Sequence, residues 1–359
     1  MSEKERLSTQ LKAGVQRHLN TFGGRLPFIQ NLGKNYAKLK ELMQLRSYDI
    51  PEPGSAEGPA IVLGSGPSLD EAIPFLKETD IPLWVTPSQL WTMLHHKIQP
   101  DCMMVHDPWP ATAKEYLPRN GDWNTATKKA LGAIRVATHP GVHPDVFKWR
   151  WITSAWMYLL QTDPFNPNSQ SAIDNICLAL YTGNNPEIKH PLNHVIMMSP
   201  STSLQAAILA SYLGYSPIYM IGYDLCQWRN RTRAQTWGAD LKERKMADWD
   251  KQYDPDLMQK GDNGYMITAS MLYEKIVALS YFQGMDGFNF VEVVADGEAG
   301  NMAKLPRIEL DAFAGGLRTT PGEIEAAREL IPAYMKEIGV KMGPPEAENV
   351  PDKNTENVS

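Results

Sequence analysis

The sequence predicts an α/β protein of the Rossmann-like class, with a mostly parallel sheet covered by helices on both faces. Short apolar runs alternate along the chain with segments of helical periodicity, which is typical of βαβ units. The run Ala60–Leu63 leads into a turn rich in glycine and serine, and a helical pattern begins at Leu69. The chain has 359 residues, of which 43% are hydrophobic and 21% charged, and this is ample for a large core.

Each element of the predicted sheet follows from such a run. We expect strands at 60–63, 82–86, 102–106, 133–137, 194–198, 217–221 and 289–294. We expect helices at 69–78, 88–96, 125–131, 169–181, 201–213 and 266–283. In the last two helices the apolar residues recur at the spacing of one helix face, as at Leu272, Ile276 and Leu279.

The composition changes along the chain predict three parts. Residues 1–50 form a helical N-terminal extension, followed by a linker rich in proline and glycine that ends at Pro59. Residues 58–300 form the Rossmann-like domain. Residues 301–359 form a helical appendage, with a helix that opens on Thr320 as its cap and a polar tail expected to be disordered.

Within the domain, the segment 227–264 combines arginines and lysines with tryptophans directly after a predicted strand. It is either a solvated insertion or a mobile lid over the site, because loops at strand ends carry substrate contacts.

Charge and hydropathy exclude several classes of function. The net charge of −6 gives no footprint for nucleic acid. The N-terminus has no apolar core of a signal peptide, and no apolar run approaches the roughly 20 residues that cross a bilayer. The 3 cysteines are scattered, which argues against a disulfide framework or a zinc site. We therefore expect a cytoplasmic protein without a membrane span, and the sequence leaves a homo-oligomer open.

The glycine-rich turn after the first strand is the first candidate site. It consists of Gly64, Ser65, Gly66, Pro67 and Ser68. Glycines let the backbone come close to a ligand, and proline fits the first turn of a helix. Backbone N–H groups at a helix N-terminus suit a phosphate. The alternative is an ordinary β–α turn with capping serines, because a short glycine motif is a weak signal.

Polar residues also follow the other predicted strands, whose carboxyl ends meet at one edge of a parallel sheet. Asp107 and Asp224 each follow an apolar strand, and each could accept a hydrogen bond from a sugar hydroxyl, hold Mg²⁺ or act as a base. The alternative for both is a loop-capping aspartate. His139 and His143 are four residues apart, but Pro140 and Gly141 break any helix between them, so we expect no metal site there.

Three stretches together carry a resemblance to a known family. They are Gly64-Ser-Gly-Pro-Ser-Leu-Asp70, Ile98-Gln-Pro-Asp-Cys-Met-Met-Val-His-Asp107 and Leu213-Gly-Tyr-Ser-Pro-Ile-Tyr-Met-Ile-Gly-Tyr-Asp224. They resemble the MptE-like domain of archaeal 6-hydroxymethylpterin diphosphokinases and of the bacterial motility accessory factors that glycosylate flagellin. The chain is more distantly similar to bacterial sialyltransferases that use CMP-sialic acid. The resemblance covers roughly residues 58–300 and implies that this domain binds a nucleotide and is a transferase.

The resemblance implies roles for individual residues. Residues 64–68 would hold the phosphate of the nucleotide. Thr86 and Gln89 match an Asn-Gln pair near the nucleotide in the sialyltransferases, and Asp107-Pro108 matches Asn-Pro beside the donor. The run Ser201, Thr202 and Ser203 matches a Thr-Ser stretch near the base and ribose. Gly222-Tyr-Asp224 matches the Gly-x-Asp that ends the last nucleotide-facing strand.

One position departs from the sialyltransferase pattern. Thr268 stands where those enzymes have a histidine that acts as the base, and a threonine hydroxyl is no base near neutral pH. This argues against sialyl transfer by that mechanism and is closer to the MptE-like pattern.

Three functions remain open from the sequence. The first is a glycosyltransferase of the motility accessory factor type, which moves a CMP-activated nonulosonic acid or similar sugar to a hydroxyl acceptor; a protein is one candidate acceptor. In it, the loop would stabilise charge on the leaving phosphate, and Asp107 or Asp224 would orient or deprotonate the acceptor. The second is a diphosphokinase that transfers pyrophosphate from ATP, and only here do we expect a cofactor, Mg²⁺ held by the two aspartates. The third is a non-catalytic nucleotide- or sugar-binding protein.

Overall fold

The centre of the fold is an eight-stranded sheet in the order β14-β13-β8-β1-β2-β3-β4-β5, in which every neighbouring pair is parallel. Its strands are β1 (Ala60–Leu63), β2 (Leu83–Val85), β3 (Cys102–Val105), β4 (Arg135–Thr138), β5 (Ala155–Met157), β8 (Ile218–Ile221), β13 (Phe290–Val294) and β14 (Arg307–Glu309). The structure is a computed structural model that describes residues 27, 30–35, 51–110, 125–148, 155–157, 159–161, 195–197, 199, 201–227, 234, 236–237, 242–243, 258–260, 266–285, 287–295 and 304–340.

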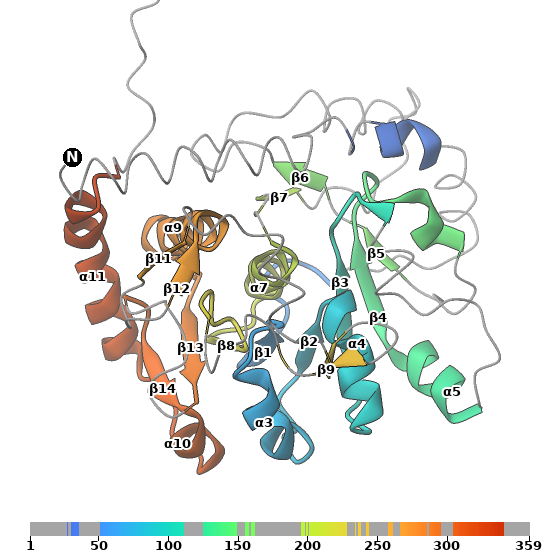
Figure 1. The fold of residues 1–359 in the computed structure, drawn as a ribbon, viewed down its shortest axis with the longest axis horizontal. Helices are drawn as coiled ribbons and strands as arrows, with labels where there is room; N and C mark the ends of the chain where they lie inside the picture. The colour runs from blue at the N-terminus through green and yellow to red at the C-terminus, as the bar shows by residue number, and fades with distance from the viewer. Residues whose placement is uncertain are drawn as a thin grey trace, which may run out of the picture.

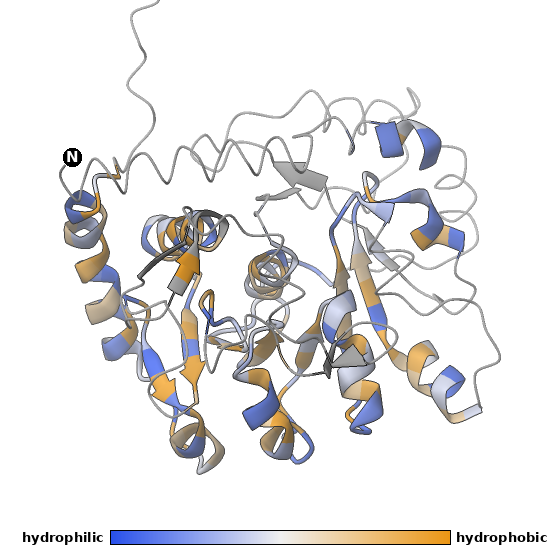
Figure 2. Ribbon diagram, in the orientation of Figure 1, coloured by the Kyte–Doolittle hydropathy of each residue, from blue (hydrophilic) through white to orange (hydrophobic). Residues whose placement is uncertain are grey.

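Helices cover both faces of this sheet, as the sequence predicts (Figure 1). One apolar cluster joins the sheet to α3 (Leu69–Leu76), α4 (Pro87–His95), α5 (Thr125–Ala133) and α10 (Leu310–Ala314). The other joins it to α7 (Thr202–Leu213), α9 (Ala269–Gly284) and α11 (Pro321–Glu337). The central strands are buried on both faces, which is why they read as continuous apolar runs. Helices such as α3 and α11 carry both apolar and polar residues, because only one side of each is buried (Figure 2).

Six of the seven expected strands lie in the sheet, as β1, β2, β3, β4, β8 and β13. The run expected at 194–198 is a strand, β7 (Val195–Met197), but it pairs with β6 (Leu159–Gln161) in a separate two-stranded sheet. The edge strands β5 and β14, of three residues each, were not among the expected strands. In β14 only the middle residue is buried, so the run lacks the apolar pattern of the central strands.

The expected helices at 69–78, 88–96, 125–131 and 201–213 are confirmed as α3, α4, α5 and α7. The helix expected at 266–283 begins later, at Ala269, because residues 266–268 form β12 (Met266–Thr268), which pairs with β11 (Met258–Lys260). The helix expected at 169–181 lies outside the described residues. The remaining elements are the 3₁₀ helix η2 (Pro144–Lys148) and a hairpin of β9 (Thr236–Trp237) and β10 (Lys242–Glu243).

The boundaries of the expected domain differ from those in the structure. β14 adds to the sheet beside β13, and Phe313 of α10 is fully buried, so the sheet and its core extend past residue 300. The predicted cap at Thr320 is confirmed, because its hydroxyl accepts a hydrogen bond from Glu323 N at 3.3 Å. At the other end, residues 30–35 are helical and Leu32, 2% exposed, belongs to the apolar core. The rest of 1–50 lies outside the described part of the chain.

Candidate active site at the carboxyl edge of the sheet

The strand order places a reversal of direction beside β1. The chain runs from β1 outward through β2, β3, β4 and β5, returns to β8 on the other side of β1, and continues outward to β13 and β14. In open parallel sheets, ligands bind beyond the carboxyl ends of the strands at this reversal. The loops that follow β1 and β8 therefore decide what the edge can bind.

Backbone hydrogen bonds join the glycine-rich loop after β1 to the loop after β8. Gly64 N donates to Ile221 O, and Gly66 N donates to Gly222 O, both at 2.7 Å. Ser68 N donates to Asp224 Oδ2 at 2.8 Å, and Ser68 Oγ donates to Asp224 Oδ1 at 2.5 Å. Three amides that the sequence analysis assigned to a phosphate thus donate within the protein. All five residues of the loop are buried, so the expected open phosphate cradle is not present.

The glycines in these two loops let two stretches of backbone approach each other. A Cβ at Gly64 would lie 2.2 Å from Gly222 O, and one at Gly66 would lie 2.5 Å from Asp224 Oδ2. Gly222 itself has a φ of +68°, which favours glycine over residues with a side chain. The requirement for glycine is therefore explained by the contact between the loops.

Asp224 has the partners of a structural carboxylate. It is 2% exposed, and each of its oxygens accepts a hydrogen bond from Ser68. Its neighbour Tyr223 is also buried, and burial, followed by the Glu274 carboxylate, raises the pKa of the Tyr223 hydroxyl well above its ordinary value. The role expected for Asp224, a base facing the ligand, does not fit this environment.

Thr86 and Gln89 likewise have structural partners. They form the capping box of α4, in which Thr86 N donates to Gln89 Oε1 at 3.0 Å. Both are buried, at 4% and 1% exposure. Their match to a nucleotide-binding pair is thus explained by the need to begin a helix directly after β2.

The first turn of α7 brings polar side chains to the ends of β1 and β3. Ser203 Oγ donates to Leu63 O at 3.2 Å, which fixes the helix over the end of β1. Thr202 Oγ1 lies 3.4 Å from Asp107 Oδ2, a long hydrogen bond that faces the end of β3. Ser201 caps the helix, because its Oγ accepts from Leu204 N at 3.2 Å. Unlike Asp224, these residues and Asp107 remain partly exposed. We call Asp107, Ser201, Thr202 and Ser203 the edge cluster.

The backbone carbonyls on either side of Asp107 accept hydrogen bonds from buried side chains. His139 Nε2 lies 2.7 Å from His106 O, and Gly141 N donates to His139 Nδ1 at 3.1 Å. Since Nδ1 accepts, the proton of the neutral ring is on Nε2. Burial lowers the pKa of His139 to about 4, so the ring is neutral near pH 7. On the other side, Pro108 O accepts from Asn31 Nδ2 at 2.7 Å.

The remaining expected site residues lie elsewhere. Thr268 is the last residue of β12, paired with Met258 and directly before α9. His143 is placed by Asp145, whose backbone N donates to His143 Nδ1 at 3.3 Å, whereas His139 contacts the end of β3. In the described ranges, no group of three or more histidine, cysteine, aspartate and glutamate side chains could hold a metal ion.

The insertion 227–264 reaches the glycine-rich loop at one described point. Ala234 N donates to Ser65 O at 2.9 Å, and Ala234 is 2% exposed. This contact adds a further cover over the loop after β1.

No helix in the part of the chain that the structure describes is long and apolar enough to cross a membrane.

Asn31, Asn35 and the buried position of Tyr223 were not predicted from the sequence. The two asparagines are four residues apart, which places them on one face of a helix, and this spacing could have identified them as a pair. The stretch around Tyr223 carried the resemblance, but its partner Glu274 is 51 positions later in the numbering. No local signal connects two residues at that separation.

A family model described as 6-hydroxymethylpterin diphosphokinase MptE-like matches residues 27–230. Among solved structures, the chain is similar to a MAf glycosyltransferase from Magnetospirillum magneticum AMB-1, with 18% sequence identity and a TM-score of 0.42. That match covers 80% of this chain and 38% of the other, so the chain spans well under half of that protein. No curated protein matches the chain.

Proposed function

Because the chain belongs to the 6-hydroxymethylpterin diphosphokinase MptE-like family, we propose that it is a transferase that uses a nucleotide-activated donor. The donor best supported by the sequence motifs is a CMP-activated sugar, transferred to a hydroxyl acceptor. The observation that carries the proposal is the partly exposed Asp107 carboxylate beside Thr202 in the first turn of α7. The donor's phosphate would lie at the edge cluster.

The start of α7 suits an anionic leaving group. A helix N-terminus carries a partial positive charge and N–H groups without partners inside the helix. Ser201 accepts from Leu204 N and Gln205 N through its Oγ and backbone O, so the ligand-facing part of the turn is at Thr202 and Ser203. Stabilisation of charge on a leaving phosphate is a large term in transferase catalysis.

Asp107 supplies the complementary group. In glycosyl transfer, the acceptor oxygen forms a bond to the anomeric carbon while the bond from that carbon to the donor's phosphate oxygen breaks. The acceptor's proton passes to Asp107, and CMP leaves with the bonding electrons. A carboxylate near the phosphate-binding turn can both orient the acceptor hydroxyl and take its proton. Asp107 is suited to this role because it is partly exposed, in contrast to Asp224.

The family's description favours a second candidate, pyrophosphate transfer from ATP to a hydroxymethyl group. There the hydroxymethyl oxygen attacks the β-phosphorus and AMP leaves. Such transfers depend on Mg²⁺ to neutralise phosphate charge. The expected magnesium pair, Asp107 and Asp224, does not fit, since both oxygens of the buried Asp224 accept hydrogen bonds from Ser68. We therefore rank this candidate second.

A nucleotide panel tests the proposal. Thermal unfolding is followed with CMP, UMP, GDP, ADP and ATP at millimolar concentration, with Mg²⁺ and with EDTA. A ligand that binds only the folded state raises the midpoint by mass action. We expect CMP to raise the midpoint of the wild type and of Thr125→Val, a control at an exposed position on α5. We expect a smaller rise in Thr202→Val, which removes a hydroxyl from the proposed phosphate-binding turn. Asp107→Asn should bind CMP at least as well as the wild type, because it removes a negative charge beside the phosphate, and should lose sugar transfer instead.

The other outcomes discriminate among the candidates. A shift with ATP that EDTA removes would favour the diphosphokinase. CMP binding without turnover of any CMP-sugar would favour a non-catalytic binding protein. If no nucleotide moves the midpoint of the wild type, the edge cluster is not a nucleotide site and the proposal fails.

A further inference from the structure

We infer that Asn31, from the N-terminal segment, is a positioning residue that fixes the Asp107 loop from one side while His139 fixes it from the other. The inference rests on the proposed function for its catalytic consequence, but its structural part can be tested alone. We call Asn31 and His139 the Asp107 brace. Through this brace, residues 30–35 help to build the proposed transferase site.

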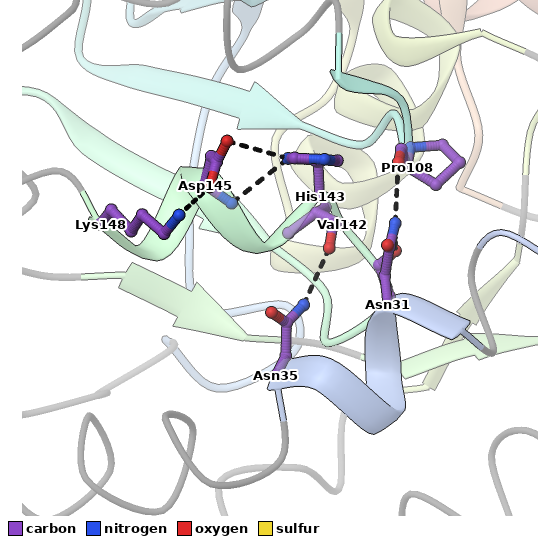
Figure 3. A network of polar contacts seen from close by, with 8 residues as sticks. Asn31, Asn35, Pro108, Val142, His143, Asp145 and Lys148 are labelled. Carbon is purple, nitrogen blue, oxygen red and sulfur yellow. Dashed lines mark hydrogen bonds and ion pairs between the residues drawn. The ribbon is translucent and has the colours of Figure 1, made fainter.

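The geometry of the segment is shown in Figure 3, in which the side chains of Asn31 and Asn35 extend from one helical turn toward the loops. Asn31 Nδ2 donates to Pro108 O at 2.7 Å and to Gly141 O at 3.3 Å. Asn35 Nδ2 donates to Pro140 O at 2.9 Å and to Val142 O at 2.8 Å. The two amide groups thus engage four backbone carbonyls.

Both asparagines are buried, at 5% exposure for Asn31 and 0% for Asn35. A side-chain amide nitrogen has two N–H donors, and here each nitrogen has two carbonyl acceptors. Carbonyls in a loop beyond a strand end have no partner in the sheet, and leaving them buried without a donor is costly. The asparagine amides therefore supply these two loops with the hydrogen-bond donors that a neighbouring strand would supply within a sheet.

The brace acts on both sides of a single residue. His106 O lies directly before Asp107 and has His139 Nε2 at 2.7 Å, whereas Pro108 O lies directly after it and accepts from Asn31 Nδ2 at 2.7 Å. The residues on either side of Asp107 are consequently held from two different elements. The Asp107 side chain leaves this fixed backbone toward Thr202 of α7. Its direction toward the edge cluster is thus set by the brace.

The extent of the family match agrees with this role. The matched region begins at residue 27 and includes the whole of 30–35, although this segment precedes the first strand of the sheet by 25 residues. Leu32, between the two asparagines, is 2% exposed and packs in the same apolar cluster as Val142. The segment is therefore anchored both by apolar packing and by the four carbonyls.

The test uses the full chain with four variants. Asn31→Asp keeps the shape of the side chain but turns an oxygen toward Pro108 O and Gly141 O. Asn35→Asp makes the same change against the β4 loop alone, and Lys34→Gln is an exposed control on the same turn. Asp107→Asn removes the charge that the brace is inferred to position. Hydrogen–deuterium exchange is measured for peptides within 103–110 and 135–148, and turnover is measured as release of CMP from a CMP-sugar with water as the acceptor.

We expect Asn31→Asp to raise exchange in both peptides, Asn35→Asp to raise it mainly in 135–148, and Lys34→Gln to match the wild type. We expect Asn31→Asp to lower the release of CMP from a CMP-sugar by about tenfold, a part of the ~100-fold or more that a positioned base contributes, because a displaced Asp107 no longer takes the acceptor's proton. In combination with Asp107→Asn it should lower this rate little further, because both changes remove the same interaction. A merely structural role would give additive losses.

Two results would overturn the inference. One is wild-type exchange in 103–110 for Asn31→Asp, and the other is full additivity with Asp107→Asn. If the wild type binds neither CMP nor ATP, the proposed function fails, and the exchange measurements still decide whether Asn31 fixes the Asp107 loop.

Discussion

The contact between Ser68 and Asp224 predicts a strong energetic coupling between the glycine-rich loop and the end of β8. Ser68 donates to the Asp224 carboxylate twice, from its backbone N at 2.8 Å and from its Oγ at 2.5 Å. Both residues are 2% exposed. A double-mutant cycle of Ser68→Ala and Asp224→Ala measures the Oγ contact, because the alanine at 68 keeps the backbone N–H.

The expected magnitudes follow from these two hydrogen bonds. A hydrogen bond to a charged, buried acceptor contributes about 1.5–3 kcal/mol, so Ser68→Ala should cost that amount. Asp224→Ala removes both acceptors and should cost about 3–6 kcal/mol. Since Asp224→Ala has already removed the acceptor of the Ser68 hydroxyl, the double variant should be little less stable than Asp224→Ala alone. The coupling free energy is then about 1.5–3 kcal/mol.

The assay is urea unfolding followed by tryptophan fluorescence, with free energies from linear extrapolation. Ser211→Ala is the matched control, because Ser211 Oγ donates to the neutral Gly287 O at 2.8 Å in a more exposed place. It should cost about 0.5–1.5 kcal/mol. Asp224→Asn should lose less than Asp224→Ala, since an amide can still accept from Ser68 N and donate to Ser68 Oγ. Additive losses within about 0.5 kcal/mol in the cycle would refute the structural role of Asp224.

Two further changes test the backbone contact and the buried histidine. Gly64→Ala should destabilise the fold by about 3 kcal/mol in urea unfolding, because its Cβ would lie 2.2 Å from Gly222 O, whereas Gly284→Ala, with nothing within 4 Å, should be neutral or stabilising; equal effects would contradict the account of the glycines. Burial lowers the pKa of His139 to about 4 from 6.5, so the unfolded chain binds its proton at higher pH than the folded protein. Stability should fall as the pH drops from 6.5 toward 4, by about 3 kcal/mol from this group. His139→Gln should lose that part of the slope when unfolding is measured between pH 7 and 4, and an unchanged slope would assign it to other groups.

The sheet could be predicted because its strands are buried on both faces. Ala60–Leu63 and Ile218–Ile221 are apolar at every position, and each is followed by residues that end a strand. The start of α11 could also be predicted, since Thr320 and Glu323 form a capping box in sequence and in structure. Edge strand β14 could not, because Ile308 is its only buried residue. Pairing with β13, and not its own composition, makes it a strand.

The partner of the glycine-rich loop could not be predicted from the sequence. A Gly-x-Gly turn indicates that something approaches the backbone closely, but a phosphate and a second backbone need the same space. Gly222, at the end of β8, is the residue whose backbone approaches Gly64. Only the strand order, in which β8 lies beside β1, shows that these two glycines face each other. Asn31 and Asn35 were missed for a related reason: asparagines on a helix are usually exposed, and their four acceptors lie 77–110 residues away.

Asp107 and Asp224 look equivalent in the sequence, but the positions of their strands in the sheet give them different environments. β8 lies directly beside β1, so the residue that follows it meets the glycine-rich loop and is enclosed with Ser68. β3 lies two positions from β1 in the sheet. The residue at its end, Asp107, faces the first turn of α7 and remains partly exposed. The proposed ligand site is therefore on the side of the edge toward β3 and α7. Substitutions of Asp224 should lower stability first, whereas substitutions of Asp107 should lower sugar transfer while leaving the fold intact.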